Sequence, residues 1–305
     1  MNKLIKSALC LFLLAGLSMA AQAAATLKPY VLASRGSGDM AATVAAVKGK
    51  LTAAGFQVVG EVEPYPTAHI IVVTNDSLKN TAAQTPFGGF GATQRVTITN
   101  ADGEIQVAYT NPLYTANVYR LKGDLADVRK ALAAALGDQG EYGPDEGLTA
   151  EDLREYHYKW LMPYFDDRLE LAEYPGFDAA VRAVEANLAK GAGGVRKVYR
   201  VDIPGKQQAV IGVSMAGPDS DTECSGDAYI MERIDFKKVK STGHLPYEML
   251  IDKGKVYALP AEFRIAISFP DLSMMGSNSF ASIMCAPSAI EAALTAAAGG
   301  SGEDD

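Results

Sequence analysis

The chain has 305 residues, of which 28 are Lys or Arg, 36 are Asp or Glu, 3 are His and 3 are Cys. Hydrophobic residues make up 48% and charged residues 21%, which excludes a wholly disordered chain, a collagen and a small disulfide-dense protein. The net charge of −8 argues against a nucleic-acid-binding protein, because phosphate binding needs clustered Lys and Arg. A chain of this length is expected to form one large or two ordinary domains.

The first 23 residues have the three-part pattern of a secretory signal peptide. Lys3 and Lys6 precede an apolar run over 8–17, which is too short to span the ~30 Å hydrocarbon core of a bilayer as a helix. We therefore expect cleavage after Ala23, a periplasmic location and no membrane insertion after cleavage; a retained membrane anchor is the alternative. Cleavage would leave 26 basic against 36 acidic residues, a net charge of −10 that disfavours nucleic acids and anionic membranes as partners.

Cleavage would also remove Cys10 and leave Cys224 and Cys285 as the two cysteines of the exported chain. Two cysteines in an exported protein most simply form a disulfide bond. A bridge closing a loop of this length is expected to stabilise the fold by about 4 kcal/mol in the loop-entropy view. A metal or redox pair and two buried thiols are the alternatives.

Two stretches of the chain have similar patterns of residues. Each contains an expected helix with one apolar face, and the apolar residues of the two helices correspond at a constant shift of 137 residues. Asp39 and Asp178 precede these helices as expected N-caps. The apolar residues are Val44, Val47 and Leu51 in the first helix, and Val181, Val184 and Leu188 in the second.

The segments that follow each helix also correspond. Each helix precedes two expected strands, a long irregular connection and a hairpin turn at 100–103 or 252–254. A strand after the turn (104–109 or 255–259), a further strand (115–119 or 263–269) and a closing helix follow, and a strand over 30–34 precedes the first helix. Each half thus has the expected order β-α-β(4)-α, and successive strands favour antiparallel sheets. We predict an α+β fold of two tandem repeats, which pair as an intramolecular pseudo-dimer.

The expected domain organisation follows from these segments. Residues 24–136 form the first α+β repeat and 178–298 the second, with a linker over 137–177. Thr149 is expected to cap a helix over 151–162 within the linker, because a Ser or Thr ahead of acidic residues is typical of a helix start. The polar, glycine-rich tail over 299–305 is expected to be disordered.

The segment 103–121, Gly-Glu-Ile-Gln-Val-Ala-Tyr-Thr-Asn-Pro-Leu-Tyr-Thr-Ala-Asn-Val-Tyr-Arg-Leu, resembles the signature of the domain-of-unknown-function family 302. The resemblance covers about 30–136, and 178–298 fits as a diverged second copy in which Glu262 and Phe263 replace Asn111 and Pro112. It implies a small α+β domain that tends to pair with another copy. The family has no established activity to carry over, so the resemblance leaves the function open.

The sequence contains few signatures of catalysis or of cofactor binding. It has no phosphate-binding loop, no dinucleotide fingerprint, no Gly-x-Ser-x-Gly motif and no Cys-x-x-Cys motif, so we expect no cofactor and assign no catalytic residue. The glycine-rich run 88–91 is flanked by Pro86 and aromatic residues, and we interpret it as a loop. Whether the protein is an enzyme stays open at this point, with a non-catalytic role favoured.

The segment 156–167 has the densest set of functional residue types, including the only Trp. Tyr156, His157, Trp160 and Asp166 are the residues that we expect to line a ligand-binding groove between the repeats, because pockets favour such interfaces. Packing of an aromatic helix face is the structural alternative, and general base catalysis by His157 is a third.

We therefore predict an exported, non-catalytic protein that binds a small ligand or a partner protein in the periplasm. The alternative function is a metal- or redox-active protein that uses Cys224, Cys285 and His244, since sulfur and imidazole ligands suit copper. The sequence predicts no other metal site, because the acidic residues lack the fixed spacing of a calcium loop.

Overall fold

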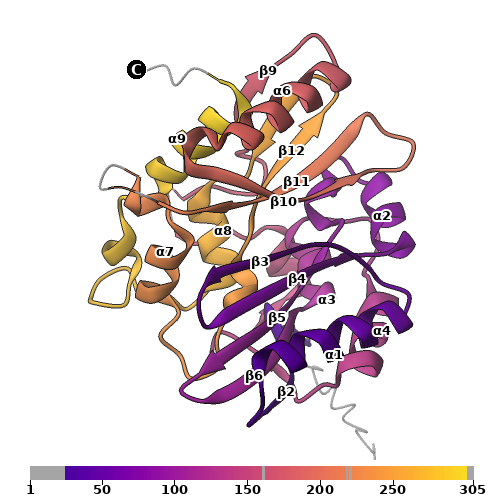
Figure 1. The fold of residues 1–305 in the computed structure, drawn as a ribbon, viewed down its shortest axis with the longest axis vertical. Helices are drawn as coiled ribbons and strands as arrows, with labels where there is room; N and C mark the ends of the chain where they lie inside the picture. Colours follow the sequence, from indigo (N-terminus) through magenta and orange to yellow (C-terminus); the bar gives the residue numbers. More distant parts are fainter. Residues whose placement is uncertain (1–24, 160–161, 218, 220–221, 301–305) are drawn as a thin grey trace, which may run out of the picture.

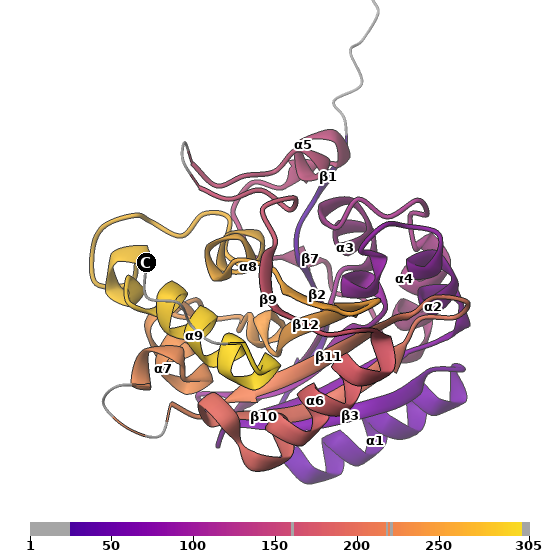
Figure 2. The ribbon, with the colours of Figure 1, turned by 90° about the horizontal axis from the view of Figure 1, so that it is seen from above.

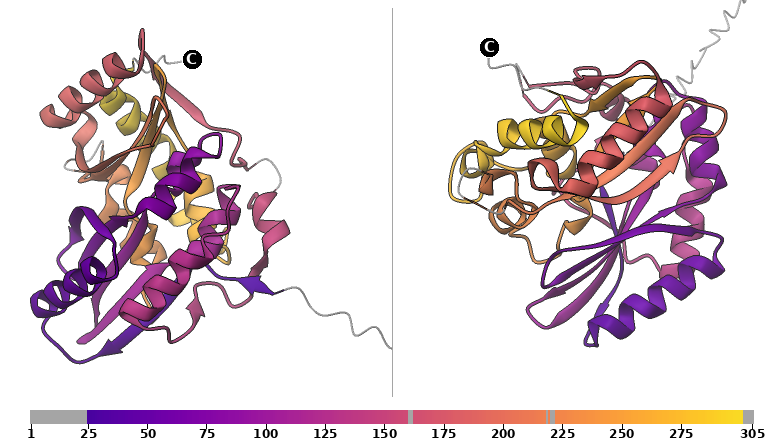
Figure 3. Two further views of the ribbon diagram at one scale, coloured as in Figure 1. Left: turned by 90° about the vertical axis from the view of Figure 1, so that its right-hand side faces the viewer. Right: turned by 45° about the horizontal axis from the view of Figure 1, so that its top comes forward.

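The computed structural model describes residues 25–159, 162–217, 219 and 222–300. Within them the protein has an α+β fold with two larger antiparallel sheets and a two-stranded ribbon, which confirms the predicted fold class. Figure 1 shows the segments from the first part of the chain at the lower end of the molecule and those from the second part at the upper end. The two further views in Figure 3 show the same separation.

The first sheet has the strand order β3-β4-β5-β6-β2-β7, and all of its pairings are antiparallel. Its strands are β2 (Tyr30–Gly36), β3 (Gln57–Tyr65), β4 (Ala68–Thr74), β5 (Gln94–Ala101), β6 (Glu104–Thr110) and β7 (Glu141–Tyr142). Its helices are α1 (Met40–Ala53), α2 (Asp76–Ala83), α3 (Pro112–Val118) and α4 (Ala126–Leu136). The ribbon pairs β1 (Thr26–Leu27) with β8 (Leu148–Thr149).

The second sheet has the order β10-β11-β12-β13-β9, again antiparallel throughout. Its strands are β9 (Leu169–Glu173), β10 (Val195–Asp202), β11 (Gln208–Met215), β12 (Tyr247–Asp252) and β13 (Lys255–Ala258). The helices of this half are α6 (Phe177–Lys190), α7 (Asp227–Ile234), α8 (Ala261–Ser268) and α9 (Ala286–Ala298). The first five strands of the other sheet have the same relative order, and the helices occur between the same strands.

The expected order of elements within each half is wrong at two places. The predicted strands over 115–119 and 263–269 are the helices α3 and α8, and α2 and α7 occupy the connections expected to be irregular. Asn111 caps α3 by accepting from the Leu113 amide, and Pro112 suits its first turn. Most residues of α3 and α8 are buried on every side, and such a helix lacks the polar face that separates helix from strand patterns.

The linker also differs from its prediction. The expected helix over 151–162 is limited to α5 (Ala150–Arg154), although Thr149 does form the expected capping box, with Asp152. After α5 the chain is held by tertiary contacts, because the hydroxyl groups of Tyr156 and Tyr158 donate to backbone carbonyls at Ala266 and Leu272. Strand β9 lies inside the predicted linker yet forms an edge of the second sheet, so that sheet begins before residue 178.

The two halves contact each other reciprocally through the connections that precede their middle strands. The short 3₁₀ helix Gly88–Gly91 of the first half packs against β11 and β12, and its counterpart Thr242–His244 packs against β4, β5 and β6. A Cβ atom on Gly89 would overlap the Leu250 side chain, which explains the glycine-rich run. The edge strands β3 and β10 also run beside each other, with α1 on the other side of β3 (Figure 2).

The closest approach of the two halves at these edges is at Gly60 of β3. A Cβ atom there would overlap the backbone carbonyl of Val198 and the Tyr199 Cβ. We expect Gly60→Ala to lower the free energy of unfolding by about 1–3 kcal/mol, because neither backbone can yield without moving a strand. Gly49→Ala in exposed α1, where nothing lies within 4 Å of the new Cβ, should instead stabilise by about 0.5–1 kcal/mol. Urea unfolding measures both changes, and equal effects would contradict the close crossing.

The predicted bond between Cys224 and Cys285 is present, with the two Cα atoms 5.8 Å apart. It ties the connection before α7 to the residue before α9. We expect Cys224→Ser together with Cys285→Ser to lower the free energy of unfolding by about 2–4 kcal/mol, because the unfolded chain regains the entropy of a long loop. Chemical denaturation without reductant measures the loss. An unchanged unfolding midpoint would contradict a stabilising role for the bridge.

Residues Phe280–Ala298, which include α9, are long and apolar enough to cross a membrane by length and composition alone, among the described residues. In the structure Ile290, Leu294 and several alanines of α9 are buried against the rest of the chain. The helix contacts α6, α8 and β9. This packing covers one face of α9, and about a third of the membrane-length stretch is buried.

Candidate functional site

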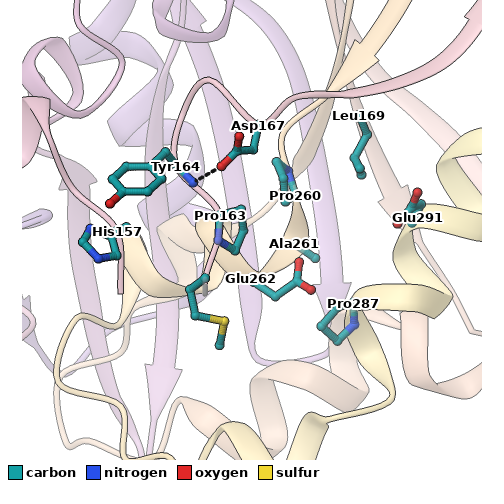
Figure 4. A pocket seen from close by; sticks show the side chains of 11 residues that line it. His157, Pro163, Tyr164, Asp167, Leu169, Pro260, Ala261, Glu262, Pro287 and Glu291 are labelled. Carbon is teal, nitrogen blue, oxygen red and sulfur yellow. Dashed lines mark hydrogen bonds between the residues drawn. The ribbon is translucent and has the colours of Figure 1, made fainter. Parts of the chain in front are cut away.

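A cavity of about 620 Å³ lies beside the segment 162–169, where that segment passes the first turns of α8 and α9. Figure 4 shows His157 and Tyr164 at one side of it and Pro287 and Glu291 at the other. The walls are formed mainly by apolar groups and by three carboxylates. The lining residues are His157, Met162, Pro163, Tyr164, Asp167, Leu169, Pro260, Ala261, Glu262, Pro287 and Glu291.

His157 and Tyr164 form the aromatic side of the cavity. Their ring centroids are 4.3 Å apart and their planes are tilted by 32°. A local turn fixes the Tyr164 backbone, because its amide donates to the Asp167 carboxylate at 2.8 Å (Figure 4). Among the described residues the His157 ring makes no hydrogen bond to a carboxylate, so the structure shows no orienting partner for a histidine base.

The opposite side carries two carboxylates from different helices. Glu262 lies in the first turn of α8, two residues after Pro260, and Glu291 lies one turn beyond Pro287 in α9. Neither side chain forms an ion pair with any residue that the structure describes, and the described lining contains no Lys or Arg. The cavity therefore combines apolar walls with negative charge that has no protein counter-ion in the described lining.

The structure brings together only part of the predicted site. His157 lines the cavity, whereas Tyr156 is directed to α8, where its hydroxyl donates to the Ala266 carbonyl and burial raises its pKa above the usual range. Asp166 lies outside the cavity, where it is paired with Arg120 and Arg168, which hold the pKa of its partly desolvated carboxyl below the usual value. Trp160 lies outside the described residues.

Three carboxylates in the lining were not chosen from the sequence. Asp167 follows the chosen Asp166. Asp167 accepts from the Tyr164 amide beside the cavity, whereas Asp166 is paired with two arginines outside it. Glu262 and Glu291 come from two helices that are separated by the loop over 269–285. A sequence signal does exist for them, since each closely follows a proline at the start of a predicted apolar element, but such a signal does not place the two carboxylates together.

A second hollow of about 840 Å³ adjoins the first and has His157 and Tyr164 in both linings. Its basic residues already have partners, because Arg120 donates to the Arg154 carbonyl and Arg154 donates to the Asn117 side chain. The rings of His157 and Tyr164 therefore line both hollows. The first hollow has three carboxylates in its lining, and the basic groups of the second are paired within the protein. The lining residues are Arg120, Ala150, Glu151, Arg154, Glu155, His157 and Tyr164.

The residues of the alternative metal or redox site are not brought together as ligands. The two cysteines are bonded to each other. His244 is fully buried, and its two ring nitrogens lie 2.9 Å from the Ser268 hydroxyl and 3.0 Å from that of Tyr247. Burial holds the pKa of His244 well below its usual value, and the nearby Arg264 and Arg95 add to this effect. Over the described ranges no three His, Cys, Asp or Glu side chains form a group suited to a metal ion.

Comparison with known proteins identifies no relative of the chain: no family model, no curated protein and no solved structure matches it. The resemblance of 103–121 to the domain-of-unknown-function family 302 therefore stays a prediction.

Proposed function

We propose that this protein is an exported, non-catalytic binding protein and that the cavity between His157 and Glu291 holds a small organic cation. The observation that carries the proposal is the unpaired state of Glu262 and Glu291 beside apolar walls, within the described residues. The matching strand orders of the two sheets support a tandem repeat, and the disulfide is compatible with export to an oxidising compartment.

The class of ligand follows from the lining. Apolar walls of proline, leucine and alanine favour a ligand with hydrocarbon surface, and aromatic rings at the edge attract cations. A carboxylate without a counter-ion attracts a positive charge. A basic side chain of a partner protein has the same chemistry as such a ligand.

Isothermal titration with benzylammonium tests this proposal, and benzoate is a control of the same shape and opposite charge. We expect benzylammonium to bind and benzoate not to bind. Glu262→Gln with Glu291→Gln should weaken binding at least about tenfold, the equivalent of about 1.4 kcal/mol. Glu63→Gln with Asp76→Asn makes the same change of net charge at exposed sites outside the cavity and should leave binding unchanged.

Three results would overturn the proposal. They are failure of benzylammonium to bind the wild-type protein at any concentration, equally strong binding of benzoate, and equal weakening of binding by the two pairs of substitutions. The last result would assign the attraction to the overall net charge of the protein instead of to the cavity.

A further inference from the structure

A further cavity, of about 390 Å³, lies apart from the two hollows beside His157, where the two halves of the molecule meet. The first half contributes the β3–β4 turn and the end of β5, and the second half contributes α7 and Lys240. Its lining offers more apolar than polar surface, and the polar part includes hydroxyl, amide, carboxylate and ammonium groups. The lining residues are Tyr65, Pro66, Thr67, Thr99, Asn100, Ala228, Met231, Glu232, Asp235 and Lys240.

The corresponding contact on the other side of the molecule is closed. There the 3₁₀ helix Gly88–Gly91 of the first half packs against the second sheet, and Gly89 leaves room for the Leu250, Gln208 and Ile203 side chains to lie directly against it. The two contacts involve corresponding connections, the one before β5 in the first half and the one before β12 in the second half. One is filled by close packing, whereas the other leaves a cavity lined by polar groups.

The most buried charged group in this lining is the Asp235 carboxylate. The residue is 7% exposed, and both carboxylate oxygens accept from the same donor, the Ser241 amide, at 3.0 Å. A carboxylate can accept about four hydrogen bonds, so among the described residues most of its capacity is unused. The Lys240 ammonium does not fill this capacity, because it donates to the Asp235 backbone carbonyl.

The remaining lining narrows the chemistry of a ligand. A ligand that supplies hydrogen-bond donors would complete the Asp235 carboxylate. Lys240 already places a positive charge beside that carboxylate, so a neutral donor suffices. The Thr67 hydroxyl and the Asn100 amide provide further polar contacts, while the Tyr65 ring and Met231 provide apolar surface. Polar edges beside an aromatic ring and a thioether match a molecule with hydroxyl groups around a hydrocarbon ring.

We propose that this cavity is a second binding site, distinct from the one beside His157, and that it takes a neutral polyhydroxylated molecule of the size of one sugar ring. The ligand donates hydroxyl groups to the Asp235 carboxylate and packs its C–H surface against Tyr65 and Met231. Because residues of both halves contact it, the ligand also stabilises their association.

Saturation-transfer NMR with D-glucose, D-galactose and myo-inositol tests this site. We expect transfer of saturation from the protein to the C–H protons of at least one of these probes. Ala228→Phe should abolish the transfer, because Ala228 is exposed on α7 and a larger side chain there fills the cavity without removing a polar contact. Ala53→Phe makes the same change at an exposed position of α1 outside the cavity and should leave the transfer intact.

Asp235→Asn is the second variant and should weaken the transfer, because it replaces one of the two acceptor oxygens with an NH2 group, which is a donor. Absence of transfer from all three probes in the wild-type protein would overturn the proposal, and so would full transfer in a folded Ala228→Phe variant. The benzylammonium titration distinguishes this site from the first, since Ala228→Phe should not change that binding.

Discussion

Glu248→Gln is expected to lower the free energy of unfolding by about 3–5 kcal/mol, because it removes the single negative charge from a buried group of charges. Glu248 on β12 lies 2.7 Å from Arg95 of β5 and 3.7 Å from Arg264 of α8, and its side chain is 1% exposed. The Tyr199 hydroxyl donates to it at 2.6 Å. Without this carboxylate two buried guanidinium groups would lack a negative partner among the described residues.

The location of the group makes this prediction informative about the architecture. Arg95 belongs to the first sheet, whereas Glu248 and Arg264 belong to the second half, so the ion pair joins the halves. Arg264 has further acceptors, the Tyr119 hydroxyl and the His244 backbone carbonyl. Loss of the Glu248 charge should therefore weaken the association of the two halves as well as the second sheet.

Urea unfolding measures the effect, with Glu185→Gln as the control. Glu185 forms a partly exposed pair with Lys197, and its loss should cost less than about 1 kcal/mol. Replacement of both Arg95 and Glu248 by Met should cost less than the sum of the two single replacements, since neither member of the Arg95–Glu248 pair is then left as an unpaired charge, although Arg264 still loses its negative partner. A loss below about 1 kcal/mol for Glu248→Gln would show that the buried pair does not hold the halves together.

The protein is expected to be more stable at pH 5 than at pH 8, because α7 carries a buried carboxyl at each end. Asp227 accepts from the Met215 amide and Asp235 from the Ser241 amide, and burial raises the pKa of each to about 7. One oxygen of Asp227 has no hydrogen-bond partner among the described groups. Relative to the unfolded chain, the folded state therefore disfavours the ionised form of both carboxyls.

The sign follows from proton binding. A carboxyl whose pKa is raised on folding contributes stability that is complete below its unfolded pKa of about 4 and is lost as the pH rises to about 7. Buried His244 acts in the opposite direction, because its lowered pKa makes the unfolded state bind a proton below about pH 6.5. The two carboxyls change the free energy of unfolding more than the one histidine does. The free energy of unfolding therefore rises by about 3 kcal/mol when the pH is lowered from 8 to 5.

Asp227→Asn isolates one of these groups without changing its size. The variant should lose most of the difference in the free energy of unfolding between pH 5 and pH 8. One of the two carboxyls that act against His244 is then gone. Asp178→Asn, at an acidic position in the first turn of α6, should leave the difference unchanged. Urea unfolding at pH 5, 6, 7 and 8 measures these slopes. A wild-type protein that is more stable at pH 8 than at pH 5 would contradict the account.

Local sequence signals predicted the parts of the fold that depend on local physics. Asp39 caps α1 by accepting from the Ala42 amide, as expected, and Gly191 ends α6 in a left-handed conformation. The hairpin turn at 100–103 is closed by a bond from the Gly103 amide to Asn100. Asp178 was expected to cap α6, but that helix begins at Phe177 with Gly176 as its cap, so Asp178 lies within the first turn.

Features that depend on tertiary contacts were not predictable from local patterns. The linker helix ends early because Tyr156 and Tyr158 are held by distant carbonyls, and α8 was mistaken for a strand because protein surrounds it on every side. The same limit applies to the candidate site. His157 was chosen from an aromatic segment, whereas Glu262 and Glu291 meet beside it only through the packing of α8 and α9.

The most direct test of the binding account is the mass of the protein purified from its natural host, measured first under native and then under denaturing conditions. The account predicts additional non-covalent mass that is lost on denaturation, and lower occupancy in the variant that carries Glu262→Gln and Glu291→Gln. The same native mass in both proteins, with nothing lost on denaturation, would contradict the proposal that the cavity beside His157 holds a ligand.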